Sequence, residues 1–74
     1  MDILKEVKNY YDTEYKEVNK AILSEYFTPI DIVDNSIQRC LGVALFVQYL
    51  DIPFDNINEL YEAQRKRLKN LLKG

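Results

Sequence analysis

Two carboxylate pairs come nearest to chemistry in this sequence. Glu14 with Glu17, and Asp31 with Asp34, each place two acids three positions apart, so that one helix face could offer both to a cation. The chain has no histidine, which removes the usual general base, the usual zinc ligand and every Ser–His or Cys–His arrangement. Solvated surface charge explains both pairs better. We therefore expect a non-enzyme with no catalytic residue, metal site, cofactor or small-molecule substrate.

Cys40 is the only cysteine, so no disulfide can form within the chain. Its neighbour Arg39 is one nearby cation, which is little support for a reactive thiolate, and we predict a small buried apolar residue. Residues 40–50 form the densest apolar run, about half the length that a membrane span needs. The N-terminus lacks the apolar core of a signal peptide, so we expect a cytoplasmic protein without membrane contact.

The chain has 74 residues, of which 47% are apolar and 30% charged, and this is typical of one folded domain over residues 1–74. A domain this small buries only roughly 60% of its unfolded surface, and its core supplies about 3–5 kcal/mol. Two glycines and two prolines favour long helices with few turns. We predict an all-α fold whose small core gains from a partner chain.

Charge is distributed unevenly along the sequence. All 12 acidic residues precede residue 63, whereas residues 63–74 carry five cations and no acid. Four of these cations define a candidate basic patch: Arg65, Lys66, Arg67 and Lys69. Cations near a helix C-terminus complement its macrodipole, which explains the cluster without a ligand. The alternative is a binding patch for an acidic partner.

Apolar residues recur at spacings of three and four near the N-terminus, which predicts one long helix over about residues 3–26. The members of this stripe are Leu4, Val7, Tyr11, Tyr15, Val18, Ile22 and Tyr26. Asp2 is a good N-cap for its start. Asp12 and Thr13 form a weak point, but the stripe keeps its register across them, so we predict that the helix is unbroken.

The predicted fold is a small bundle of three main helices, over about residues 3–26, 36–50 and 55–72, with a short helical connector at 29–34. Thr28 and Pro29 suit a helix start. The polar stretch 34–36 suits a second start, which would separate the connector from the helix that follows. One continuous helix over residues 29–50 is the alternative. Asp55 can cap the last helix.

The second helix is apolar on more sides than a bundle covers. On a helical wheel its core face consists of Ile37, Cys40, Leu41, Ala44 and Val47. Gly42, Phe46 and Tyr49 lie on the far side, where two neighbouring helices leave it uncovered. A glycine on that side would let another backbone come close. These three residues are therefore candidates for a protein interface.

The first helix predicts a second uncovered region, because about 24 residues make it longer than the other two. Its overhanging start would carry Leu4, Val7 and Tyr11, and Tyr10 flanks its stripe as a candidate contact residue. A second copy of the chain could cover this region together with the far side of the second helix. The leading interpretation is a non-catalytic protein-interaction or regulatory protein, acting as a homodimer or on another protein.

Residues 47–60, VQYLDIPFDNINEL, resemble the core of a helix-turn-helix DNA-binding motif. The positions that match its inner residues are apolar: Leu50, Ile52, Ile57 and Leu60. The resemblance implies a DNA-binding transcriptional regulator that uses residues 47–67, and this is the alternative function. The chain departs from the motif at Asp51, where a turn glycine is usual. Its recognition helix would also present Glu59 and Glu62, which phosphates repel, so we do not expect a nucleic-acid partner.

Overall fold

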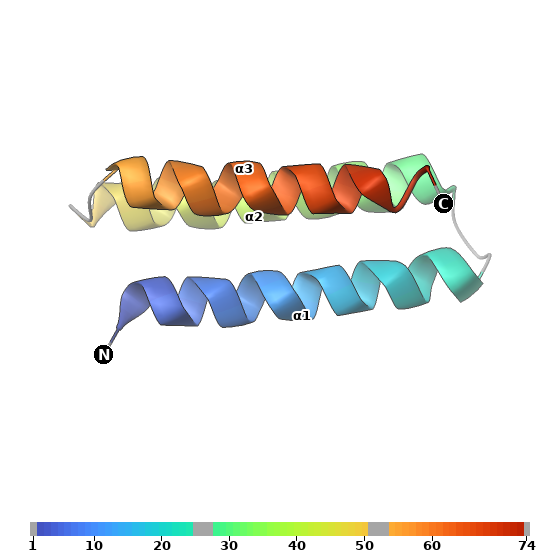
Figure 1. Ribbon diagram of the computed structural model, residues 1–74, viewed down its shortest axis with the longest axis horizontal. Helices are drawn as coiled ribbons and strands as arrows, with labels where there is room; N and C mark the ends of the chain where they lie inside the picture. Colours follow the sequence, from blue (N-terminus) through green and yellow to red (C-terminus); the bar gives the residue numbers. More distant parts are fainter. Residues whose placement is uncertain (1, 25–27, 51–53, 74) are drawn as a thin grey trace.

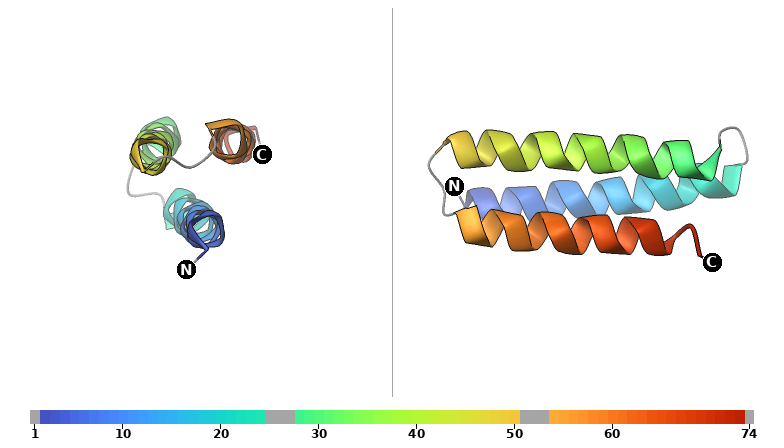
Figure 2. Two further views of the ribbon diagram at one scale, coloured as in Figure 1. Left: turned by 90° about the vertical axis from the view of Figure 1, so that its left-hand side faces the viewer. Right: turned by 90° about the horizontal axis from the view of Figure 1, so that it is seen from above.

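The computed structural model describes residues 2–24, 28–50 and 54–73, and these residues form three α-helices (Figure 1). The helices are α1 (Ile3–Ser24), α2 (Pro29–Tyr49) and α3 (Phe54–Asn70). Successive helices run in opposite directions side by side, and seen end-on they occupy the three corners of a triangle (Figure 2). The prediction of an all-α bundle with three main helices is confirmed.

α1 is one unbroken helix, as its continuous apolar stripe predicts. At its start the backbone N–H of Lys5 donates to Oδ1 of Asp2 at 3.3 Å, so Asp2 caps the helix. The predicted weak point does not interrupt it, because Tyr11 and Val18 on either side of it are both buried on the same face of the helix; the Thr13 hydroxyl donates to the carbonyl of Asn9 at 3.0 Å. The helix ends at Ser24, and the last member of the predicted stripe lies outside the described residues.

α2 is a single helix of 21 residues, so the separate connector at 29–34 is wrong and the continuous alternative is right. Pro29 is its first residue, as predicted, and Thr28 precedes it without a side-chain capping hydrogen bond. At the other end the helix finishes at Tyr49, close to the predicted boundary.

Burial explains why α2 continues through its polar stretch. Val33 and Ser36 are both fully buried, so the core stripe extends backward from Ile37 at helical spacing. The Ser36 hydroxyl donates to Oε1 of Glu14 on α1 at 3.4 Å instead of capping a new helix. Packing against α1 therefore overrides the local capping preference of residues 34–36.

α3 ends at Asn70, and the chain continues as a turn in which the N–H of Leu71 donates to the carbonyl of Leu68 at 3.1 Å. The predicted helix over residues 55–72 is thus close to the observed one. The side chain of Asp55, the predicted cap, lies outside the described residues.

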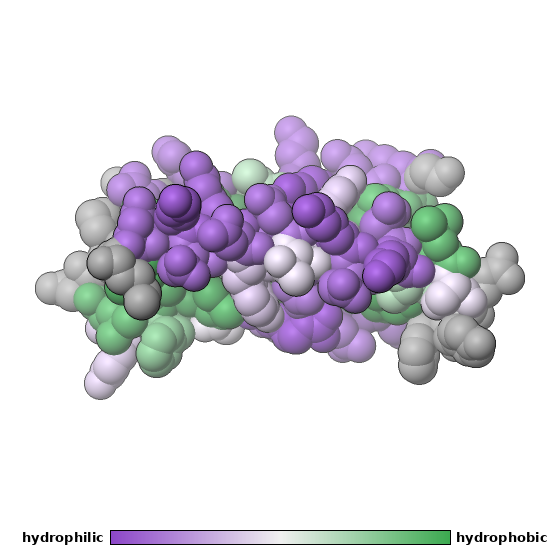
Figure 3. All heavy atoms as spheres, turned by 90° about the horizontal axis from the view of Figure 1, so that it is seen from below, coloured by the Kyte–Doolittle hydropathy of each residue, from purple (hydrophilic) through white to green (hydrophobic). Residues whose placement is uncertain are grey.

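The core lies between the three helices and comes largely from residues at helical spacing, with two differences from the prediction: Val33 of the expected connector is buried, and Leu41 is only half-buried and lies outside the core. Its buried members are Val7, Tyr11, Val18, Val33, Ile37, Cys40, Ala44, Val47, Ile57 and Leu68. Other large apolar side chains remain exposed, and on the face seen in Figure 3 hydrophobic residues gather toward the two ends of the bundle.

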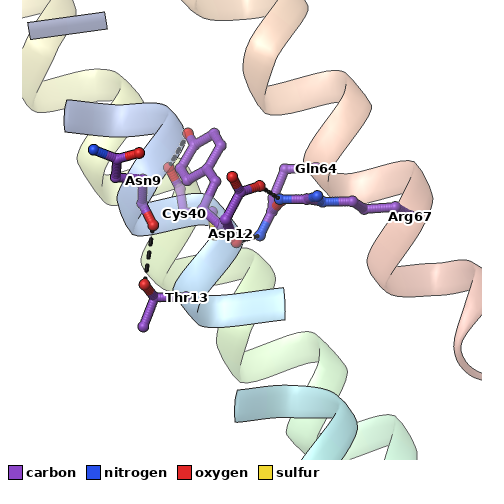
Figure 4. Close-up of polar contacts among 7 residues, drawn as sticks. Asn9, Asp12, Thr13, Cys40, Gln64 and Arg67 are labelled. Atoms are coloured by element: carbon purple, nitrogen blue, oxygen red, sulfur yellow. Dashed lines mark hydrogen bonds and ion pairs between the residues drawn. The ribbon is translucent and has the colours of Figure 1, made fainter. Parts of the chain in front are cut away.

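A buried hydrogen-bond network joins all three helices (Figure 4). Gln64 of α3 is only 2% exposed, and its Nε2 donates to the backbone carbonyl of Tyr11 in α1 at 2.9 Å. The same nitrogen lies 3.6 Å from Sγ of Cys40 in α2. The Tyr11 hydroxyl donates to the carbonyl of Cys40 at 2.8 Å. Within the described residues, no buried side-chain nitrogen or oxygen lacks a hydrogen-bond partner.

Arg67 completes this network at the protein surface. Its Nε donates to Oε1 of Gln64 at 2.6 Å, and its Nη2 donates to Oδ1 of Asp12 at 2.9 Å. The guanidinium carbon lies 4.8 Å from the centroid of the Tyr15 ring, which is cation–π distance. Both ends of the Gln64 amide are therefore paired, and its orientation is fixed from two sides.

We expect Gln64→Ala to destabilise the protein by about 2–4 kcal/mol, because it removes two hydrogen bonds and leaves a cavity between the helices. Urea unfolding followed by circular dichroism measures the change. Gln38→Ala, at an exposed position of α2, is the matched control and should stay within about 0.5 kcal/mol of the parent. Equal effects of the two substitutions would contradict a structural role for Gln64.

Burial also makes stability sensitive to alkaline pH. It raises the pKa of the Tyr11 hydroxyl and of the Cys40 thiol, since both charged forms are disfavoured in the core. In the unfolded chain these groups ionise near about pH 10 and 8.5, while the folded protein keeps their protons. Stability is complete below these values and falls as pH rises above them, by up to about 1.4 kcal/mol per pH unit for each group.

Tyr11→Phe should therefore lose stability less steeply than the parent as the pH rises above 10, since it removes the most deeply buried of the tyrosine hydroxyls whose pKa is raised. Urea midpoints measured between neutral and alkaline pH test this. Indistinguishable slopes for the parent and Tyr11→Phe in that range would contradict it. The loss of stability that begins at about pH 8.5 comes from Cys40 and should persist in Tyr11→Phe.

Candidate protein-interaction surface

An apolar groove lies between the beginning of α1 and the end of α2, which are neighbours because the two helices are antiparallel (Figure 1). We call it the α1–α2 groove. Its apolar lining comes from Ile3, Val7 and Tyr10 of α1 and from Val43, Phe46 and Leu50 of α2. Its volume is about 360 Å³, and among the residues that the structure describes Glu6 is the one charged side chain that lines it. Such a surface suits apolar side chains of another polypeptide rather than a charged ligand.

The far side of α2 is uncovered, as the helical wheel predicts. Phe46 is 62% exposed and Tyr49 is 86% exposed. Around Gly42 the space is open, since a Cβ built there would meet no atom within 4 Å. We call Gly42, Phe46 and Tyr49, with the exposed flanking residue Leu45, the outer face of α2. Phe46 belongs to both the outer face and the α1–α2 groove, so the two form one surface.

The predicted overhang of the first helix is wrong. α1 has 22 residues and α2 has 21, because the stretch predicted as a connector belongs to α2. Val7 is 4% exposed and packs in the core, where it also forms the floor of the groove. Leu4 is half-buried beside Leu60, in the depression between α1 and α3. These two residues therefore do not join Phe46 and Tyr49 on an exposed surface.

Tyr10 does lie on the groove, and polar contacts follow one turn further along. Oε1 of Glu14 accepts a hydrogen bond from Nε of Arg39, and this bond raises the pKa of the guanidinium. The pKa of Tyr10 is raised mainly by partial burial and further by the charge of Glu14. The Tyr10 hydroxyl is therefore neutral at physiological pH. The ion pair marks the point along α1 and α2 where the apolar surface gives way to a charged one.

The structure divides the candidate basic patch. Arg65, Lys66 and Lys69 are exposed on one side of α3. Arg67 lies two positions and about 200° from Arg65 on the helix, so it faces α1 and bonds to Asp12 instead. Arg65 is 3.9 Å from Glu62, a weak surface contact. The basic patch on the surface of α3 therefore consists of three residues rather than four, and Glu62 lies beside it.

The residues with potential chemistry do not assemble into a site. Glu14 forms an ion pair with Arg39, while the side chains of Glu17, Asp31 and Asp34 are exposed to solvent. In the described part of the chain, no group of three acids and cysteines is placed to hold a metal ion. Cys40 is buried, and burial raises the pKa of its thiol, which lowers its reactivity at neutral pH.

The helix-turn-helix resemblance does not extend to the geometry. α2 and α3 run antiparallel along their lengths as a hairpin (Figure 2), whereas the DNA-binding motif crosses its helices at about 90–120°. Asp51 and Ile52, on which the resemblance partly depends, lie outside the described residues.

Sequence reasoning missed Gln64 and underestimated part of the groove. In the third helix the apolar residues Ile57, Leu60, Tyr61 and Leu68 recur at helical spacing, and Gln64 falls in the gap between Tyr61 and Leu68, so that gap was a usable signal. Val43 and Leu50 lie at one edge of the apolar side of α2, so their part in the groove became evident only once α1 was placed beside them.

No known protein family model matches the chain, and comparisons with curated proteins and with solved structures find no match. Within the described residues, no helix combines the length and apolar character needed to cross a membrane.

We expect duplex DNA to bind only weakly and without sequence preference, at about micromolar affinity or worse in ~150 mM salt. Removing Arg65, Lys66 or Lys69 should lower the salt dependence by about one unit of slope each, because each cation can neutralise one phosphate. Arg67→Ala should leave the slope unchanged, since Asp12 already pairs with this residue. Fluorescence anisotropy across a salt series tests both, and a sequence-specific site bound at nanomolar affinity would contradict the expectation.

Proposed function

We propose that this chain is a small non-catalytic protein-interaction or regulatory protein that acts as a homodimer. A second copy of the chain covers the outer face of α2 and the adjoining α1–α2 groove. The observation that carries the proposal is the exposure of Phe46 and Tyr49 next to a mainly apolar groove, on one side of α2 that the bundle does not cover.

Energetics support a partner for this surface. The core of a domain this size supplies about 3–5 kcal/mol, and each exposed large apolar side chain forgoes about 1.5–3 kcal/mol of burial. The largest contiguous apolar patch on a monomer, typically about 300–600 Å², is often an interaction site. Pairing with a second copy buries the patch twice in one event, which is the simplest way for a small domain to enlarge its core.

Phe46→Glu tests the proposal at the centre of the surface. Because this side chain is mostly exposed, the substitution should leave the helix content of the monomer intact and abolish self-association. Sedimentation equilibrium up to ~100 μM, with circular dichroism for helicity, measures both.

Leu23→Glu is the matched control. Leu23 is 74% exposed near the opposite end of the bundle from the groove, so this equivalent change should not affect association. A monomeric parent protein at ~100 μM would sink the homodimer. Equal loss of association in both variants would show that general hydrophobicity, and not this surface, drives assembly.

A further inference from the structure

α2 carries two helical seams on opposite sides. The buried seam consists of Val33, Ile37, Cys40, Ala44 and Val47, at spacings of four and three. The exposed seam consists of Arg39, Gly42, Phe46 and Tyr49, at spacings of three, four and three. Gly42 lies about 200° around the helix from Cys40, so the second seam points almost directly away from the bundle. Spacings of this kind are those by which one helix packs along another.

The exposed seam is complementary to itself when two copies run in opposite directions. If Phe46 of one copy lies opposite Gly42 of the other, the same register places Arg39 opposite Tyr49. The Phe46 ring then occupies the open space above the glycine, where a Cβ would meet no atom of its own chain. The Arg39 side chain is about half exposed and pairs through Nε with Glu14 of its own chain, so it can keep that ion pair while the face of its guanidinium lies over the most exposed tyrosine of the other copy, a cation–π arrangement. Two-fold symmetry makes each contact twice.

Other pairings are poorer. A parallel pair sets each residue beside its own copy, which brings the two Arg39 side chains together. An antiparallel pair with glycine opposite glycine places Phe46 against Gln38 and Arg39 against Leu45, so that polar groups meet apolar ones without partners. The register with Phe46 over Gly42 avoids both faults and matches large to small along the seam.

The available area fits a dimer of modest affinity. Whole aromatic side chains bury roughly 150–250 Å², so the exposed parts of Phe46, Tyr49 and Leu45, with the half-exposed Arg39 side chain, provide at most on the order of 500 Å² per chain. Two copies together reach about 1,000 Å², the lower limit for a specific interface. An interface of this size and composition predicts association in the micromolar range.

We infer that two copies of this chain pair antiparallel through the outer faces of α2, with Phe46 of each packed over Gly42 of the other. The inference rests on the proposed homodimer and specifies how it forms. Only residues 39–49 of the two α2 helices overlap in this register, so the bundles extend in opposite directions. The dimer is therefore longer than the 39 Å extent of one chain.

Gly42→Leu separates this pairing from association in general. The position is open in the monomer and leucine is the better helix former, so helicity should hold or rise. The added side chain fills the space for Phe46, and we expect dimerisation to weaken at least tenfold. Gly42→Ala, a smaller addition, should weaken it less. If Gly42→Leu dimerises as tightly as the parent, or more tightly, the proposed pairing is overturned. If Phe46→Glu at the same time fails to dimerise, the proposed homodimer still stands, and only the way in which its helices pair is wrong.

A distance measurement tests the direction and register. A spin label on Asp31→Cys sits at an exposed position outside the overlap, and the unmodified chain is the control because Cys40 is buried. About 26 residue positions separate the two labels along the helices, which corresponds to roughly 40 Å at 1.5 Å per residue. Pulsed electron–electron resonance should give that distance. A separation below about 20 Å would indicate parallel helices and overturn the inference.

Discussion

The hydrogen bond from the Gln64 side chain to the main chain of Tyr11 is the contact on which the rest of the bundle depends. An apolar core tolerates several rotations of a helix, whereas a buried amide is stable only where its donors and its acceptor find partners. Gln64 meets that condition with Nε2 toward α1 and Oε1 toward Arg67. This fixes the rotation and the axial position of α3 against α1. The bond from the Tyr11 hydroxyl to the carbonyl of Cys40 does the same for α2.

The rotation of α3 also decides which charges reach solvent. With Gln64 inside, Arg67 lies over Tyr15 and bonds to Asp12, so one cation of the basic run stabilises the contact between α1 and α3. Its neighbours Arg65 and Lys66 face away from the bundle. The exposed cation Lys69 lies in the last turn of α3, where the helix macrodipole favours positive charge. A continuous basic run in the sequence thus becomes two features with separate roles.

α2 presents the opposite situation, because it has more apolar surface than the bundle uses. A glycine in a helix interior costs about 1 kcal/mol relative to alanine, and nothing within the chain requires one at Gly42. Phe46 and Tyr49 next to it also remain largely exposed. Within the monomer, neither the glycine nor the exposed aromatic side chains contribute to the stability of this small core. Their position on one face, beside a mainly apolar groove, is what directs the proposed function to the outer face of α2.

The spacing of apolar residues determined the three helices and the exposure of Phe46 and Tyr49, since the side of a helix on which a residue lies is a local property. Whether residues 34–36 cap a new helix or continue an old one was not decided locally, because these residue types suit both. Burial of Ser36 against α1 decided it, and the longer α2 then removed the overhang expected at Val7. Gln64 belongs to the core only because two residues satisfy its amide: Tyr11, which is distant in sequence, and Arg67, which is on the next turn of the same helix. Helical periodicity depends on residues that are neighbours in sequence, so it can be predicted from the sequence. The hydrogen bonds of buried polar groups form only when the helices pack together, so they depend on the tertiary structure.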